Sequence, residues 1–297
     1  MSDPTFLYCV GATKAGTSWL YRTLHEHPEC HVRAVKEVHY WDTFDAEKRD
    51  KQVVMLDANL LKFKAQREDA LAAEQGWKVR NMDRRIRDMG DLITMLNADR
   101  SHDLAYGRYM IDGLGDATLV ADMTPGYATV DVNIYQRMVA DNPAARVLFL
   151  IRDPLARLWS HVRMQAKRQM LDGEDYSEKA NNTLWRVLNK GQETHLLERG
   201  DYKGTIEKLR QVIPAKQLMV AFTESMFTVP GLAKICEFLR ISVPAQNQNE
   251  RVHQGDAAQM RDKLVPQTVR FLKDQYEWVA EHVGPMPAAW QASLARG

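Results

Sequence analysis

The sequence predicts an α/β fold of P-loop-like form, three layers in which helices flank a central parallel sheet. Apolar runs at residues 6–10, 118–125 and 145–151 are each long enough for one buried strand. A helical pattern follows the first run after a short loop and the third run almost directly, and strands that alternate with helices favour a parallel sheet. A charged, helix-like stretch at about residues 42–112 predicts a helical insertion.

The first strand ends in a glycine-bounded loop, Gly11-Ala-Thr-Lys-Ala-Gly-Thr-Ser, before a helix at residues 19–25. This arrangement directs backbone N–H groups at a phosphate-like anion. Gly11 and Gly16 have Walker A spacing, but Thr17 stands where that motif has its lysine, and Lys14 lies inside the loop instead. The loop therefore predicts an anion cradle, with a plain glycine turn as the alternative.

Pro28 ends the first helix, and residues 29–33 predict a short second strand. Residues 35–41, Val-Lys-Glu-Val-His-Tyr-Trp, are dense in titratable and aromatic side chains, and composition alone favours an exposed loop with one aromatic anchor. In the insertion, an apolar stripe recurs at helical spacing and predicts a helix packed outside the core: Met82, Ile86, Met89, Ile93 and Leu96. Arg80, Arg84 and Arg87 form a basic stripe that is either a solvated face or a rim attracting an acidic acceptor.

The run at residues 145–151 ends at Arg152-Asp153-Pro154, where Asp153 can cap a helix and Pro154 can take its first position. Arg152 thus leaves the sheet at its carboxyl edge, where ligands of open α/β sheets bind.

The last third of the chain predicts one more strand, ended by Glu224, and a covering helix. Residues 242–258 predict a loop, and one C-terminal amphipathic helix serves packing only; its apolar positions are Val269, Leu272, Tyr276, Val279 and Val283. Without a repeat or linker, the sequence predicts a single domain over residues 1–297, with a loop and helix at about 242–297; the resemblance described below implies that this loop is a lid.

Composition limits the classes of partner that we expect this protein to bind. A net charge of +1 over 297 residues gives no bulk attraction to nucleic acid or membrane. Cys9 lies in the first apolar run and predicts a buried free thiol, as in a reducing compartment. With neither a signal peptide nor a long apolar stretch, we expect a soluble, cytoplasmic protein; the oligomeric state is left open.

The segment Thr13–Leu20 resembles the 5′-phosphosulfate loop of sulfotransferases that use 3′-phosphoadenosine 5′-phosphosulfate (PAPS). Among these enzymes, the resemblance is to a bacterial member of the family. The resemblance implies that Lys14 contacts the sulfuryl bridge. It also implies a set of nucleotide-binding residues around the 5′-phosphate and adenine: Ala15, Gly16, Thr17, Ser18 and Trp19.

Lys-Glu-x-His-Tyr at residues 36–40 resembles heparan-type glycan sulfotransferases, which implies Glu37 as catalytic base and Lys36 near the transferring group. His39 is the competing base, because imidazole titrates near neutrality. Residues 122–127 resemble an acceptor-side segment of the same proteins and implicate three residues in acceptor binding, with a purely structural role as the alternative: Asp122, Thr124 and Tyr127.

Arg152 followed by Ser160 resembles the family's 3′-phosphate motif, which suits the bidentate grip of a guanidinium on phosphate. Family members also place a basic, glycine-containing loop over the nucleotide, and its counterparts here are Arg251, His253 and Gly255.

The implied reaction moves a sulfuryl group from PAPS to a hydroxyl or amine, with a carbohydrate favoured as acceptor and small metabolites as alternatives. It releases 3′,5′-ADP and needs no metal. The competing interpretations are a P-loop nucleotide kinase or ATPase, with Asp122 as Mg²⁺ ligand, and a non-catalytic nucleotide-binding module.

Overall fold

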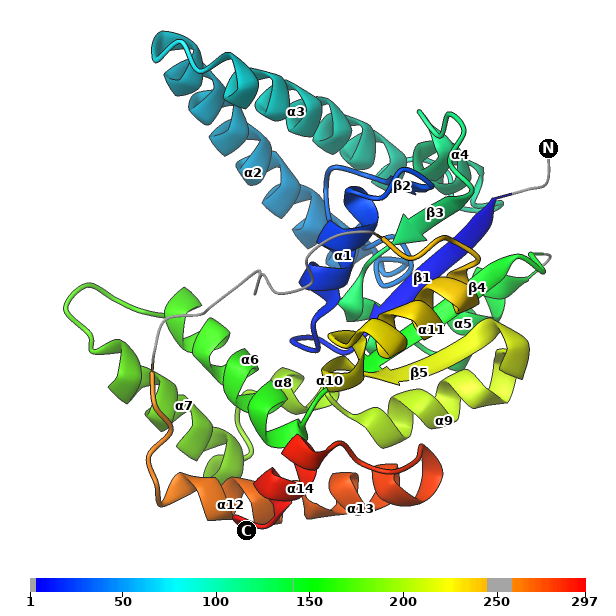
Figure 1. Ribbon diagram of the computed structural model, residues 1–297. Coiled ribbons are helices and arrows are strands. Elements are labelled where there is room, and N and C mark those ends of the chain that lie inside the picture. Colours follow the sequence, from blue (N-terminus) through cyan, green and yellow to red (C-terminus); the bar gives the residue numbers. More distant parts are fainter. Residues whose placement is uncertain (1–3, 141, 245–257) are drawn as a thin grey trace.

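A computed structural model describes residues 4–140, 142–244 and 258–297. Its centre is a five-stranded sheet in the order β2-β3-β1-β4-β5, with every neighbouring pair parallel (Figure 1). The strands are β1 (Thr5–Gly11), β2 (Cys30–Val32), β3 (Leu119–Asp122), β4 (Ala145–Ile151) and β5 (Leu218–Phe222). The predicted α/β fold with a central parallel sheet is confirmed.

The two central strands are buried along their whole length, because helices cover both faces of the sheet. Every residue of β1 and β4 is buried, and these strands are the continuous apolar runs that the sequence shows. The Cys9 side chain on β1 has no exposed surface and is a free thiol, as predicted.

Helices α1 (Thr17–His25) and α11 (Val229–Leu239) lie on one face of the sheet, in front of it in Figure 1. The His27 ring contacts the Ser242 carbonyl oxygen at 3.0 Å and so joins the segments that follow these two helices. Helices α5 (Val132–Val139) and α9 (Tyr202–Val212) pack against each other on the opposite face. The sheet and the helices on its two faces form the three predicted layers.

The insertion forms a long helical hairpin of α2 (Ala46–Ala72) and α3 (Gly76–Leu96), followed by α4 (Leu104–Ile111). The hairpin projects from the sheet (Figure 1). Met82, Met89 and Leu96 are buried, as the apolar stripe predicted, and Leu92 and Met95 are buried with them. The helical prediction for this region is confirmed.

Three predicted boundaries are wrong. Strand β3 ends at Asp122, and Pro125 begins a 3₁₀ helix, η1 (Pro125–Thr129). Strand β5 ends at Phe222, and Glu224 lies in α10 (Thr223–Met226). The C-terminal pattern forms two helices, α12 (Leu264–Phe271) and α13 (Lys273–His282), because the chain leaves helical geometry at Leu272.

The remaining helices build the flank on the β4–β5 side, with a short 3₁₀ turn, η2 (Ala215–Gln217), before β5. They are α6 (Pro154–Arg168), α7 (Tyr176–Lys190), α8 (His195–Glu198) and α14 (Ala288–Leu294). Pro154 takes the first turn of α6, as predicted, but the Asp153 side chain caps nothing. It accepts hydrogen bonds from the hydroxyls of Tyr276 and Ser293 instead, so the C-terminal helices do more than cover the core.

Of the helices that the structure describes, none combines the length and the apolar character that crossing a bilayer requires.

Candidate active site

The glycine loop is held by the ends of two neighbouring strands, β4 and β5. The Ala12 amide donates to the Leu150 carbonyl of β4 at 2.7 Å. The Thr223 hydroxyl, directly after β5, donates to the Ala15 carbonyl at 2.7 Å. The loop shape is therefore fixed before any ligand binds.

Both glycines of the loop are required by geometry. Gly16 has φ +86°, and an added Cβ would lie 3.0 Å from the side chains of Met226 and Thr223. At Gly11, with φ +153°, a Cβ would lie 2.7 Å from the Phe149 ring. A larger residue at either position would have to displace the loop.

Helix α1 begins at Thr17, and no side chain caps its first turn. The first N–H groups of a helix have no partner within the helix, and the helix dipole adds partial positive charge there. Ser18 lies in the same turn with its side chain partly exposed. These features suit an anion at the loop, so the plain glycine turn is the weaker interpretation.

The two motifs that lie far apart in the sequence meet at this loop. The Arg152 guanidinium donates to the Lys14 carbonyl oxygen at 3.2 Å, across 138 residues of chain. The Lys14 Nζ lies 3.9 Å from the Met164 Sδ on α6. Ser160 precedes Met164 by one helical turn, so it lies on the same side of α6. Residues predicted to bind the two ends of one nucleotide therefore share one region.

Positive charge gathers around Lys14. Burial lowers the pKa of its ammonium, and the nearby cations of Arg152, Arg163, Arg168 and Lys36 lower it further. A group of cations held this close together is stabilised by a bound anion, since each charge repels the others until an anion offsets them.

The Lys36–Asp42 segment builds a chain of charged groups. Glu37 accepts a hydrogen bond from the Lys36 Nζ at 2.8 Å, and its other carboxylate oxygen lies 3.5 Å from the His39 Nε2. The His39 Nδ1 lies 2.8 Å from an oxygen of Asp42. The Glu37 side chain is 41% exposed, so its carboxylate is the member of this chain open to a substrate.

The two predicted bases, Glu37 and His39, differ in their protonation state at neutral pH. Burial alone would lower the pKa of His39, but hydrogen bonds and charges from Asp42 and Glu37 outweigh it and raise the pKa to about 10. Burial alone would raise the pKa of Glu37, but His39 and Lys36 hold it well below its usual range. At neutral pH the histidine is thus a cation with both nitrogens occupied, and the glutamate is ionised.

Asp122 lies beneath this segment with no exposed surface. Its carboxylate accepts hydrogen bonds from three hydroxyls, those of Thr124 at 2.6 Å and of Tyr106 and Tyr127 at 2.9 Å. Burial raises the pKa of Asp122 to about 6, and these hydrogen bonds oppose the shift. A carboxylate enclosed in this way is not placed as a Mg²⁺ ligand facing phosphates.

Thr124 and Tyr127 also hold the Lys36–Asp42 segment directly. The Thr124 hydroxyl accepts from the Val38 amide at 2.9 Å, and the Tyr127 hydroxyl accepts from the Tyr40 amide at 3.1 Å. Both side chains are fully buried, so contact with an acceptor would require the segment above them to move. Their placement agrees with the structural alternative given for residues 122–127.

Sequence reasoning missed Asp42 and Gly126. A Cβ on Gly126 would lie 2.6 Å from the Asp42 carboxylate and 3.2 Å from the His39 ring, so this glycine leaves room for their contact. In the sequence, Asp42 could have been identified only by its position three residues after His39.

The remaining predicted residues lie apart from these contacts. Trp19 is buried, with its ring edge-on to Phe227 at a centroid distance of 5.1 Å. The predicted lid residues lie outside the described part of the chain: Arg251, His253 and Gly255.

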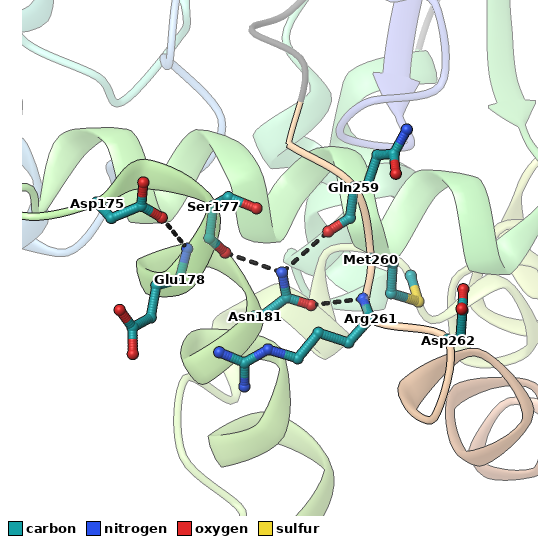
Figure 2. Close-up of a pocket in the computed structure, with 8 residues that line it drawn as sticks. All are labelled: Asp175, Ser177, Glu178, Asn181, Gln259, Met260, Arg261 and Asp262. Atoms are coloured by element: carbon teal, nitrogen blue, oxygen red, sulfur yellow. Dashed lines mark hydrogen bonds between the residues drawn. The ribbon is translucent and has the colours of Figure 1, made fainter.

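A pocket of about 440 Å³ lies elsewhere, between α7 and the segment before α12 (Figure 2). Asn181 closes its floor with hydrogen bonds to the Ser177 and Gln259 carbonyls and from the Arg261 amide. None of the predicted site residues lines this pocket. Within residues 4–140, 142–244 and 258–297, no group of three or more His, Cys, Asp or Glu side chains could hold a metal ion.

The fold is that of an α/β protein with a glycine-bounded loop and a group of cations at the carboxyl edge of its parallel sheet. The model of the sulfotransferase family matches residues 5–245, and the chain belongs to that family. No curated protein sequence matches it.

Solved structures of similar fold include a sulfotransferase from Alicyclobacillus acidocaldarius, at 20% identity and a TM-score of 0.60, covering 98% of this chain and 100% of that one. The sulfotransferase domain of the curacin biosynthetic pathway is 18% identical, with a TM-score of 0.48 and coverage of 86% and 79%. The corresponding domain of the olefin synthase from Synechococcus PCC 7002 is 15% identical, with a TM-score of 0.43 and coverage of 100% and 94%.

Proposed function

We propose that this sulfotransferase takes its sulfuryl group from PAPS and transfers it to a hydroxyl or amine, with a carbohydrate as acceptor and Glu37 as base. The contact between the Arg152 guanidinium and the Lys14 carbonyl carries the proposal. It brings a predicted 3′-phosphate site and a predicted 5′-phosphosulfate site close enough for one nucleotide to bridge them.

The donor side of the reaction depends on electrostatics. As the sulfuryl group leaves PAPS, negative charge grows on the 5′-phosphate oxygen. Lys14 and the uncapped N-terminus of α1 would stabilise that charge, and groups fixed in advance lower the barrier most effectively. Arg152 and Ser160 would hold the 3′-phosphate.

On the acceptor side, Glu37 would remove the proton from the attacking hydroxyl or amine, an effect typically worth about 10²–10⁴-fold in rate. His39 is a poor base here, because both of its nitrogens face carboxylates and its pKa is raised to about 10. A low pKa also weakens Glu37, so we expect the acceptor to replace its contact with Lys36 or His39.

The donor assignment is tested by nucleotide binding. Arg152→Ala and Ser160→Ala should each weaken binding of 3′,5′-ADP while leaving 5′-AMP nearly unchanged, because only the former carries a 3′-phosphate. Isothermal titration of both nucleotides on each variant measures this. An equal loss for the two nucleotides would contradict the 3′-phosphate role, and stabilisation by Mg·ATP alone would favour a kinase.

The base is tested by Glu37→Gln, which keeps the shape of the side chain and removes its proton affinity. Affinity for 3′,5′-ADP should be unchanged, and turnover with labelled PAPS should fall by about 10²–10⁴-fold. His39→Ala is the matched comparison. Full activity in Glu37→Gln together with loss in His39→Ala would assign the base to His39.

The acceptor class is tested separately, by incubating the wild-type protein with labelled PAPS and panels of glycans and small alcohols. Labelled glycan products support the carbohydrate acceptor. Labelled small alcohols alone would replace it, and nucleotide binding without any product would indicate a non-catalytic module.

A further inference from the structure

The outer face of α2 is apolar and uncovered. Val54 is 68% exposed and Leu61 67%, although each is a large hydrophobic side chain, and the two share one side of the helix because they are seven residues apart. The opposite face of the same helix packs on α3 and buries Leu56 and Ala70. Apolar side chains gathered on one exposed face of a helix indicate a surface that another molecule covers.

The spacing of the residues on this face indicates what kind of molecule covers it. Exposed residues follow one another at alternating steps of four and three: Val54, Ala58, Leu61, Ala65, Glu68 and Ala72. This is the seam of a coiled coil, in which side chains of one helix fit between those of a second helix. Alanines recur every seven residues, and small residues let two helices approach closely.

We propose that a second copy of this chain covers this face, with the two α2 helices antiparallel about a two-fold axis. Leu61 of each copy then lies against Ala58 of the other, and Val54 lies against Ala65. Each large side chain meets a small one, which is the pairing that fills a helix interface without voids. The contact is self-complementary, as a two-fold interface requires.

The charges on the seam and beside it fit this one register. Three pairs of opposite charge face each other across the interface, each occurring twice by symmetry: Lys51 with Glu68, Lys48 with Asp69, and Asp57 with Lys64. All six of these residues are exposed in the single chain. A parallel pairing would instead place Lys51 against Lys51 and Glu68 against Glu68. The charges therefore select the antiparallel orientation, and the apolar seam supplies the affinity.

This arrangement places the tip of each hairpin near the base of the other. In the same register, the turn at residues 73–75 falls beside the first residues of α2 in the second copy. That end of the helix follows Asp42 by a few residues, so the dimer contact runs towards the candidate active site.

Sedimentation velocity over a hundredfold range of concentration tests the proposal on the full chain. We expect a species of twice the 34.1 kDa chain mass for the wild type, and a monomer at every concentration for Leu61→Asp. Lys51→Glu should weaken the dimer by about tenfold, because an acidic side chain at position 51 then faces the Glu68 carboxylate. Adding Glu68→Lys should restore it, since the pair is reversed and not removed.

Arg84→Glu is the matched control, because it makes the same kind of charge change on the exposed face of α3. It should leave the dimer unchanged, and circular dichroism should show native helix content in all variants. A wild-type monomer, or a dimer that tolerates Leu61→Asp, overturns the proposal. A dimer that Leu61→Asp breaks but the double charge reversal fails to restore overturns the antiparallel register.

Discussion

Three of the residues considered for sulfuryl transfer have a positive φ, in the left-handed region of backbone conformation. Lys14 has φ +71°, Glu37 φ +69° and His39 φ +55°, although none is glycine. Such a conformation costs about 1–3 kcal/mol per residue, so it persists only where surrounding contacts impose it. At Glu37 and His39 those contacts are the hydrogen bonds from the Val38 and Tyr40 amides to Thr124 and Tyr127. The strain aims the carboxylate and the imidazole at each other.

Asp42 should control the protonation of His39. In Asp42→Asn the imidazolium loses its nearest negative charge, and its pKa should fall from about 10 towards the ordinary histidine value. NMR titration of the His39 ring, assigned by comparison with His39→Asn, measures this shift. An unchanged pKa would show that Glu37 alone keeps the ring charged.

The raised pKa also sets a stability window. A charged His39 stabilises the folded chain fully below pH 6.5, the ordinary histidine pKa, and this contribution disappears as the pH rises through about 10. Thermal unfolding of the wild type should therefore show a loss of stability between pH 7 and 10 that is smaller in Asp42→Asn.

Among the elements, the helical hairpin is attached to the core by the buried side chains of α3 and by one buried ion pair. Arg33, in the segment after β2, donates to the Asp88 carboxylate of α3 from Nε at 2.6 Å and Nη2 at 2.5 Å. The other Asp88 oxygen accepts from the Val35 amide at 2.6 Å. The guanidinium also lies 4.2 Å from the centre of the Tyr109 ring. These contacts fix α3 to the segment that leads into Lys36 and Glu37.

Removing Asp88 should therefore be costly. Asp88→Ala leaves the buried Arg33 charge without its main partner, and such a change typically costs about 3–5 kcal/mol. Asp91→Ala is the matched control, because Asp91 is half exposed and lies 3.7 Å from the same guanidinium; it should change the free energy of unfolding by less than about 0.5 kcal/mol. Urea denaturation of both variants gives the comparison. Equal effects would show that Asp88 adds nothing beyond surface charge.

At the scale of the whole molecule, the C-terminal helices are attached to the end of β4, next to the site. Asp153 follows Arg152 directly and accepts hydrogen bonds from Tyr276 of α13 and Ser293 of α14. Trp290 has no exposed surface and packs edge-on against Phe222 and Tyr276, with centroid distances of 5.2 and 6.0 Å. The last helices thus support the strand end that presents Arg152.

Trp290→Ala should lower the free energy of unfolding by about 3–5 kcal/mol, the usual cost of emptying a buried aromatic site. Trp185→Ala removes the same side chain from a position that is 43% exposed, and its effect should be small. Thermal melts of the two variants measure the difference, and affinity for 3′,5′-ADP should decline only in Trp290→Ala. Similar melting temperatures for the two variants would mean that α14 is not part of the folded core.

The sequence by itself determined the parts that depend on short-range pattern. Continuous apolar runs identified β1 and β4, Pro154 identified the start of α6, and an apolar stripe identified α3. Residues 11–18 already carried the spacing of an anion-binding loop, because a turn of this kind depends on glycines at fixed positions.

Only the tertiary structure decided which of these parts meet, since contacts between distant segments leave no trace in local spacing. It joined Arg152 to Lys14, gave His39 its Asp42 partner beside Gly126, and enclosed Asp122 beneath the Lys36–Asp42 segment. It also divided the C-terminal helix at Leu272 and bound Tyr276 to Asp153. In each case the outcome depends on burial and on the hydrogen-bond partners that folding brings together.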